Sequence, residues 1–274
     1  MSSSTVHNVE VPPSARLNRS QRMLALLARL RERDTISLAD LAAELGVSAA
    51  TMRRDVAELE EQRLLRRTHG GVAAVESALE LPMALRNTRV PEAKVLIARG
   101  AAQLVAPGRQ VVALSGGTTT LETARALANR RQLTIVTNSL TAASEVGRHP
   151  HLQVIMTGGV MRPHSFELVG ALAEHTFTAV NIGTAFLGVD GISATTGATT
   201  HDETEARTNR AMVAQAHRTV VVADGAKIGA VTVASIVPAT DIDDLVTDAS
   251  ADPVEVQKLR DLGIRVHVMT AAMR

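Results

Sequence analysis

The sequence predicts an α/β protein made of two unlike parts. Its 274 residues are 45% hydrophobic and 21% charged, which is enough apolar material for one or two ordinary cores. From residue 19 to 75 apolar residues recur at helical spacing, whereas later in the chain apolar, β-branched runs alternate with helical stretches. We therefore expect a disordered lead-in over 1–18, a small helical domain over 19–75, a linker over 76–92 and an α/β domain over 93–274.

The composition excludes several kinds of chemistry. The chain has no Cys, Trp or Tyr, which excludes disulfides, thiol nucleophiles and cysteine metal sites and removes the usual aromatic platforms for bases and sugars. Its three phenylalanines, at 166, 177 and 186, are expected in the core. No targeting segment and no run of eighteen apolar residues is found, so a cytoplasmic protein without a membrane span is expected. The remaining polar groups suit the binding of phosphate and other anions.

Three amphipathic helices are predicted in the N-terminal domain. Apolar stripes at helical spacing run over 23–30, 38–45 and 52–59. Ser48 is placed to cap the third helix, and Gly46 suits a left-handed turn at the end of the second. About three residues thus join the second and third helices, which is the spacing of a helix-turn-helix.

The third helix of a helix-turn-helix enters the major groove of double-stranded DNA by its N-terminal end. Small residues there let the backbone approach base edges, and arginines one turn further can reach guanine or phosphates. Residues 64–72 suit a short β-hairpin, a basic wing that would hold the DNA backbone. An arginine pair on a helix is usually just solvated, but the stripes, the turn and the wing together favour DNA binding. The candidate DNA-contacting residues are Ser48, Ala49, Ala50, Thr51, Arg53, Arg54, Arg66, Arg67 and His69.

Apolar runs without polar alternation predict a largely parallel sheet in the second domain, with helices on both faces. Strands are expected over 111–114, 133–136, 152–156, 184–187 and 219–223, and three more over 234–237, 244–246 and 265–269 would extend the same sheet. Helices are expected over 92–105, 119–130, 140–148, 203–216 and 253–262.

Polar or glycine-rich loops follow three successive strands of this predicted sheet. Ligands bind beyond the carboxyl ends of the strands in an open parallel sheet, so these loops would converge on one crevice. The first loop combines unpaired N–H groups at a helix start with threonine hydroxyls, which suits a phosphate. A lone Gly-Gly turn is usually a plain connection, but three such loops favour a small-ligand site. The candidate effector-contacting residues are Ser115, Gly116, Gly117, Thr118, Thr119, Thr120, Thr137, Asn138, Ser139, Gly158, Gly159 and Lys227.

An enzyme is the alternative class. Residues 113–117 differ by one residue from the nucleophile elbow of serine hydrolases, with Ser115 as the nucleophile and Asp190 or Asp224 preceding a histidine. This interpretation leaves the threonines and the DNA-binding segment unexplained. The close histidine pair at 149 and 151 lacks a third partner at ligand spacing, so no metal is expected.

Two parts of the chain resemble the DeoR type of bacterial transcriptional regulators. The run LAAELGVSAATMRRDVAELE at 41–60, followed by LRRTHGG at 65–71, is similar to the DNA-binding domain of that family. The sensor domain of that family is similar in fold to ribose-5-phosphate isomerase and glucosamine-phosphate deaminase. This chain resembles the sensor domain at 117–120, 137–140, 158–159, 170, 185–188, 191–192, 224 and 227–229. The resemblance implies a sugar-phosphate effector, with residues 117–119 and 138–139 near its phosphate and Lys227 near the sugar.

Three positions depart from that family. Arg63 stands where relatives usually carry a glycine before the wing, so the turn at this position need not be as tight as in those relatives. Ser115 and Gly183 stand where relatives usually have aspartates, and the loss of these acceptors for sugar hydroxyls leaves the effector open. A retained isomerase activity would need a carboxylate base, for which Asp202, Glu203 and Glu205 are available.

Together these observations predict a sequence-specific DNA-binding regulator rather than an enzyme. We expect a repressor of a carbohydrate operon that binds its operator as a homo-oligomer, a dimer or a tetramer. A phosphorylated sugar in the C-terminal domain would release it by binding the DNA-incompetent state more tightly. The alternative is a sugar-phosphate isomerase-like or serine hydrolase enzyme that uses the 113–120 loop. No cofactor and no membrane partner are expected.

Overall fold

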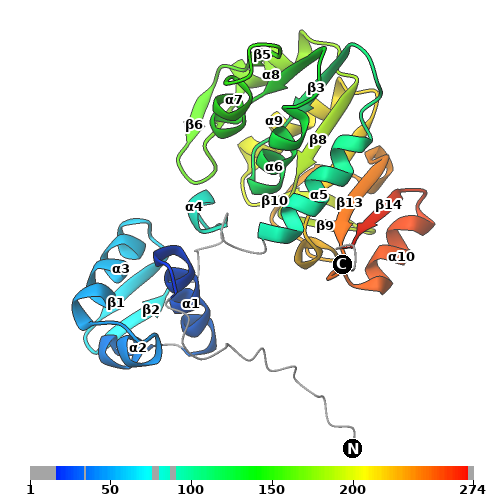
Figure 1. The fold of residues 1–274 in the computed structure, drawn as a ribbon. Coiled ribbons are helices and arrows are strands. Elements are labelled where there is room, and N and C mark those ends of the chain that lie inside the picture. Colours follow the sequence, from blue (N-terminus) through cyan, green and yellow to red (C-terminus); the bar gives the residue numbers. More distant parts are fainter. Residues whose placement is uncertain (1–16, 34, 76–79, 87–90, 271–274) are drawn as a thin grey trace, which may run out of the picture. The chain divides into compact units, whose positions relative to one another are not determined.

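The computed structural model describes residues 17–33, 35–75, 80–86 and 91–270, so nearly all of the predicted lead-in lies outside the described residues. The chain divides into two compact units between Leu79 and Glu80 (Figure 1). The second unit therefore begins inside the segment expected to be a linker.

The first unit is a bundle of three helices with a β-hairpin. Each helix begins where its sequence offers a cap, because Asn18, Ser37 and Ser48 accept backbone N–H groups of the first turns with their side chains. The predicted stripes meet in a buried core that contains Leu26 and Leu41. The elements are α1 (Arg19–Glu32), α2 (Leu38–Glu44), α3 (Ala49–Glu61), β1 (Leu65–Thr68) and β2 (Gly71–Ala74).

The second unit is built on a seven-stranded parallel sheet with the order β14-β13-β11-β8-β3-β4-β5. The central strands β8 and β11 are almost wholly buried, which explains why they read as unbroken apolar runs. The strands are β3 (Gln110–Leu114), β4 (Leu133–Thr137), β5 (Gln153–Met156), β8 (Thr184–Gly188), β11 (Thr219–Val222), β13 (Asp244–Asp248) and β14 (Arg265–Met269).

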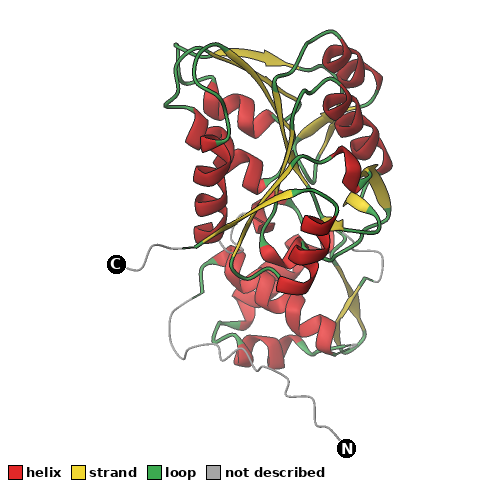
Figure 2. Cartoon of the chain, turned by 90° about the vertical axis from the view of Figure 1, so that its right-hand side faces the viewer, coloured by secondary structure: helices red, strands yellow, loops and turns green. Residues whose placement is uncertain are grey.

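Helices cover both faces of this sheet (Figure 2). One core joins α5, α6 and α7 to the sheet around Phe186, and the other joins α8, α9 and α10 to it around Phe177. The fold class predicted from the sequence is thereby confirmed. The helices are α5 (Pro91–Gln103), α6 (Thr118–Leu127), α7 (Leu140–Val146), α8 (Ala171–Thr178), α9 (Glu203–Ala214) and α10 (Pro253–Asp261). In the described part of the chain, no helix is long and apolar enough to cross a membrane.

The strand expected at 234–237 does not extend the parallel sheet. It forms β12 (Ala234–Val237), which pairs antiparallel with β10 (Gly197–Thr200) in a separate sheet completed by β9 (Gly191–Ser193). The prediction failed because its partner β10, like the next strand β9, is a short, glycine-containing segment without a strand pattern.

A hairpin of β6 (Val160–Arg162) and β7 (Glu167–Val169) was also not expected. The placement of Phe166 in the core is wrong, because this residue lies in the hairpin turn at φ 55° and is 40% exposed. The remaining elements are α4 (Met83–Arg86) and the short 3₁₀ turns η1 (Gly225–Lys227) and η2 (Ala239–Asp241).

Candidate functional site

The predicted recognition helix α3 presents small residues at its start. Ser48, Ala49 and Ala50 are exposed, and Thr51 is half-buried. The Thr51 N–H donates to Ser48 Oγ at 3.2 Å, and the two hydroxyl oxygens lie 3.0 Å apart. The hydroxyls of Ser48 and Thr51 thus fix the helix start, while the exposed alanines leave its surface open to close approach.

The arginine pair on α3 is exposed, and its neighbour Asp55 faces the opposite way. Asp55 is buried and accepts from Arg22 Nε at 2.5 Å; this hydrogen bond, outweighing desolvation, raises the pKa of Arg22. Asp55 therefore ties α3 to α1 and does not order Arg53 or Arg54. Within the described residues neither arginine forms an ion pair, which leaves both guanidinium groups available to an anion.

The wing carries further exposed cations. Arg66 and His69 are exposed, and Arg67 is held by Glu60 of α3, with 2.9 Å between Nε and Oε2. Val72 of β2 pairs with Ile36, which fastens the hairpin to the segment before α2. The Arg67–Glu60 ion pair therefore connects the wing to the predicted recognition helix, and both carry exposed cations.

The glycine loop after β3 leads directly into α6. Gly117 takes φ 113°, and the first turn of α6 has no side-chain cap, so its N–H groups are open to an anion. The hydroxyl groups of two predicted ligand residues form hydrogen bonds that hold the loop in place. Ser115 Oγ accepts from Gly188 N at 2.9 Å, and Thr120 Oγ1 donates to the Gly116 carbonyl at 2.7 Å.

The loop after β4 is fastened in the same way. Thr137 Oγ1 donates to the Leu114 carbonyl at 2.7 Å and accepts from Ser139 N at 3.0 Å, while Ser139 Oγ caps α7. Asn138 between them is fully buried, and neither its amide oxygen nor its amide nitrogen has a hydrogen-bond partner. The buried Thr157, just before the Gly158-Gly159 loop, likewise has an unpartnered hydroxyl.

The hairpin β6–β7 brings a carboxyl group to the glycine loop. Leu168 N donates to the Asn138 carbonyl at 2.8 Å, which places Glu167 beside the loop after β4. The Glu167 carboxyl lies against Gly116 so closely that a side chain there would overlap it. Glu167 is buried with Oε2 unpartnered, and burial together with the charge of Glu205 raises its pKa well above the usual range.

Further charged groups surround this carboxyl. Lys227 Nζ lies 3.2 Å from Asp190 Oδ1; burial raises the pKa of Asp190, but the charges of Lys227 and Arg86 outweigh it and lower that pKa. Thr200 Oγ1 lies 3.1 Å from Asp190 and 2.7 Å from Glu205, so one hydroxyl joins the two carboxyl groups. Glu205 in turn binds an arginine of β6, Arg162.

Sequence reasoning missed several of these groups. Arg86, Arg162, Thr157 and Glu167 carry no motif and lie in a segment expected to be a linker or in short loops and strands. Asp190 and Glu205 were considered only as members of an enzyme site. The serine hydrolase alternative does not fit, because Ser115 is fully buried and its hydroxyl is engaged within the loop.

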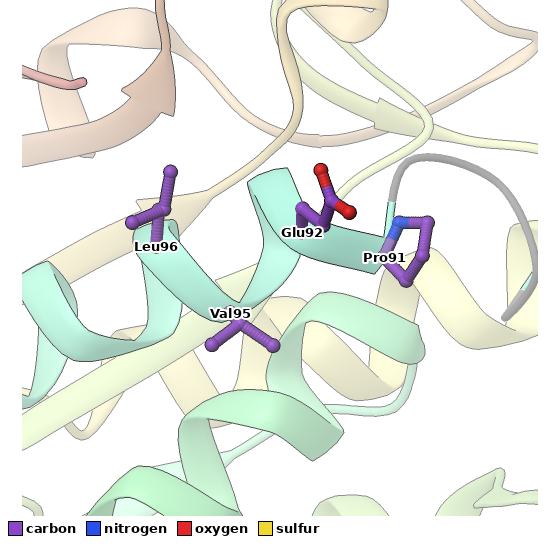
Figure 3. Close-up of a pocket in the computed structure, with 4 residues that line it drawn as sticks. All are labelled: Pro91, Glu92, Val95 and Leu96. Carbon is purple, nitrogen blue, oxygen red and sulfur yellow. The ribbon is translucent and has the colours of Figure 1, made fainter. Parts of the chain in front are cut away.

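A hollow of about 380 Å³ lies elsewhere, along the start of α5 (Figure 3). Its lining consists of Pro91, Glu92, Val95 and Leu96, of which Glu92 alone is charged. A carboxylate on an apolar wall repels a phosphate, so this hollow does not compete with the glycine loop as an anion site.

A winged helix-turn-helix joined to an α/β domain with a glycine loop at an uncapped helix start is the architecture of a DNA-binding regulator with a sensor domain. Residues 19–78 match the DeoR-like helix-turn-helix domain, and residues 89–249 match the DeoR C-terminal sensor domain. The chain belongs to the DeoR family of transcriptional regulators.

Known relatives align over nearly their whole length. The putative aga operon transcriptional repressor of Escherichia coli O157:H7 is 34% identical over 254 residues, covering 90% of this chain and 93% of the relative. The glycerol-3-phosphate regulon repressor of Escherichia coli K12 is 28% identical, covering 92% of this chain and 100% of the relative. Among solved structures, ribose-5-phosphate isomerase A from Methanocaldococcus jannaschii aligns with a TM-score of 0.38 and 19% identity, over 52% of this chain and 55% of that one.

Proposed function

We propose that this protein is a repressor of an operon for carbohydrate or polyol metabolism and that a phosphorylated sugar or polyol releases it from its operator. The observation that carries the effector site is a group of buried, unpartnered polar atoms beside the open start of α6. They belong to Asn138, Thr157 and Glu167. Buried polar groups without partners are costly, and a hydroxyl-rich ligand would satisfy them.

The phosphate fits the glycine loop. The N–H groups at the start of α6 are uncapped, and among the described residues the hydroxyls of Thr118 and Thr119 have no hydrogen-bond partner. The hydroxyls of Ser115 and Thr120, which are used to hold the loop, would position these donors rather than bind the ligand. A phosphate would be held by aligned N–H groups and two hydroxyls.

The sugar or polyol part fits the polar groups next to the loop. Glu167 has an unpartnered carboxyl oxygen, and its raised pKa favours the protonated form, which can donate one hydrogen bond; the Asn138 amide can both donate and accept. These groups would take the place of the carboxylate that the sequence lacks at Ser115. Gly183 would not take part, because it lies at the opposite end of the sheet, beside Val111 at the start of β3. Gly158, Gly159 and Lys227 would border the same ligand.

Operator binding is assigned to the exposed surface of α3 and the wing. Arg53 and Arg54 would reach base edges or flanking phosphates, and Arg66, Arg67 and His69 would contact the backbone. A dimer or tetramer would place two such surfaces on paired half-sites, as the two-fold symmetry of operators requires.

The direct test of operator binding is a gel shift with the protein's own promoter at several salt concentrations. Replacing both Arg53 and Arg54 with Ala should abolish specific binding and reduce the slope of log K against log salt by about 2. The matched control removes two exposed arginines of the sensor, Arg99 and Arg109, and should bind as the wild type does. Equal affinity of the wild type for promoter and random DNA would refute the proposal.

The effector site is tested by thermal shift with a fixed set of probes. The set comprises sn-glycerol 3-phosphate, fructose 1-phosphate, the 6-phosphates of glucose and galactosamine, and inorganic phosphate. At least one organic phosphate should raise the Tm, and T118A/T119A should lose that rise while the exposed control T240A keeps it. If no probe stabilises the wild type, the effector assignment is wrong.

A further inference from the structure

The segment 80–86, which we call the strap, precedes the sensor fold in sequence but is packed against it. Met83 is buried, and its N–H donates to the His164 carbonyl in the β6–β7 turn at 2.9 Å. Glu80 Oε2 accepts from Arg162 Nη2 of β6 at 2.7 Å, and Lys94 Nζ of α5 donates to the Arg86 carbonyl at 2.5 Å. The strap is therefore seated on the hairpin that carries Glu167.

Arg86, the last residue of the strap, extends its guanidinium group into the charged cluster beside the glycine loop. Its Nη2 lies 3.2 Å from Glu80 Oε1, and its Nη1 lies 3.7 Å from Asp190 Oδ1. Its charge also acts on the Glu167 carboxyl, the group that lies against Gly116. A residue from the connection to the DNA-binding domain thus belongs to the wall of the candidate effector site.

The Arg86 pairing is incomplete. Its Nε is buried and has no hydrogen-bond partner, and the 3.7 Å approach to Asp190 is longer than a hydrogen bond. Asp190 has a second cation in Lys227, at 3.2 Å, and the Thr200 hydroxyl at 3.1 Å. Asp190 would therefore stay paired if Arg86 moved, so the guanidinium group can turn to another anion without leaving a buried charge alone.

The other two cations of this cluster, Arg162 and Lys227, are already paired with carboxylates and do not lie on the strap. Arg162 is engaged by three carboxylates, those of Glu80, Asp202 and Glu205, and Lys227 is held by Asp190. Of these three cations, Arg86 is the one that lies on the strap, and among the described residues it is the one with a buried nitrogen atom that has no hydrogen-bond partner.

We propose that Arg86 is an effector-binding residue carried by the strap, and that an anionic effector draws its guanidinium group away from Glu80 and Asp190. The strap lies between the two units in sequence, so a shift of the strap would be passed along the chain towards the DNA-binding domain. Arg86 thereby joins effector recognition to release from the operator. This inference rests on the proposed function, because it takes the phosphorylated effector as the anion.

The experiment uses full-length protein and the phosphate probe that stabilises the wild type most strongly in the thermal-shift set. Probe affinity is measured by calorimetry, and operator release is measured by fluorescence anisotropy of labelled promoter DNA. R86Q should weaken probe binding at least tenfold and lose release at probe concentrations that saturate the wild type. R86K, which keeps the charge, should retain part of both, and the exposed control R99Q should match the wild type.

A purely structural role for Arg86 gives a different pattern. R86Q would then lower the ligand-free Tm or operator affinity but leave probe affinity and release unchanged, and that result would overturn the inference. A second variant, E80Q, removes the strap carboxylate that competes for Arg86 and should lower the probe concentration needed for release. A rise in that concentration would count against the inference. Failure of every probe to bind the wild type would instead overturn the proposed function together with it.

Discussion

The carboxyl group of Glu167 fills the space that a side chain at Gly116 would occupy. Glu167 belongs to β7 and Gly116 to the loop after β3, and about fifty positions separate them in sequence. Because Glu167 is buried, its side chain has little room to move aside. The glycine at this position is thus required by the carboxyl group packed on it, whereas Gly117 is the one whose backbone conformation favours glycine.

Replacing Gly116 with Ala should destabilise the sensor domain and disturb the glycine loop. The added methyl group overlaps Glu167, and overpacking of this kind costs about 1–3 kcal/mol. Urea unfolding measures the loss. The double variant G116A/E167S, in which the shorter side chain makes room, should recover part of it, so the two changes should be non-additive. Additive losses would show that the contact does not set the requirement for glycine.

Replacing Glu167 with Gln should flatten the dependence of stability on pH. Burial, followed by the charge of Glu205, raises the pKa of Glu167 in the folded protein. Its contribution to stability is therefore complete below the unfolded pKa of about 4.3 and is lost as pH rises through the folded pKa. Gln stays neutral, so E167Q should be more stable than the wild type at pH 8 but not at pH 4.

Urea unfolding at both pH values measures this difference, with the exposed Glu203 changed to Gln as the control. A wild type that loses no more stability than E167Q between pH 4 and pH 8 would contradict the assignment of a neutral carboxyl. Probe binding adds a second readout, because a glutamine amide can replace a donated hydrogen bond and E167A cannot.

The parts of the fold that could be predicted are those whose structure is set by residues close together in the sequence. Ser48 is a cap by its own chemistry, and the buried strand around Phe186 reads as an unbroken apolar run. The convergence of the loops at 115–120 and 137–139 follows from parallel topology alone, since both stand at carboxyl ends of neighbouring strands.

The parts that could not be predicted depend on contacts between distant segments. Glu167 belongs to a strand of three residues, too short to show a period, and reaches the site only because β7 pairs with the loop at Asn138. Arg86 stands in a segment whose prolines and mixed polarity are typical of a linker. Its role depends on Asp190, a residue more than one hundred positions away.

Asp244 should be the main source of acid sensitivity at the other end of the sheet. This fully buried carboxylate accepts from Arg218 at 2.7 Å, Arg265 at 2.8 Å and His267 at 2.8 Å. Burial alone would raise its pKa, but hydrogen bonds from the two arginines and the histidine outweigh it and hold the pKa far below the ordinary value. Its stabilisation is present above the unfolded pKa of about 3.9 and fades as pH falls below it.

Replacing Asp244 with Asn should cost about 1.5–3 kcal/mol at pH 7, because it removes a carboxylate that accepts charged hydrogen bonds from partly solvated cations. The cost should shrink as the pH approaches 3, where the wild type begins to lose the same contribution. Chemical denaturation at the two pH values measures it, with the exposed Asp241 changed to Asn as the control. A cost that does not change with pH would show that packing, not charge, explains the loss.

Arg63 should be a point of strain that glycine relieves. It connects α3 to the wing with φ 57°, a left-handed conformation that costs a residue with a Cβ atom about 1–2 kcal/mol. Glycine adopts it freely but loses up to about 1 kcal/mol in backbone entropy, so R63G should stabilise the first unit by up to about 1 kcal/mol. R63A removes the same exposed side chain but keeps the Cβ atom, and it should bring no gain. Thermal unfolding compares the two variants, and equal stabilities would mean that the backbone at this turn carries no strain.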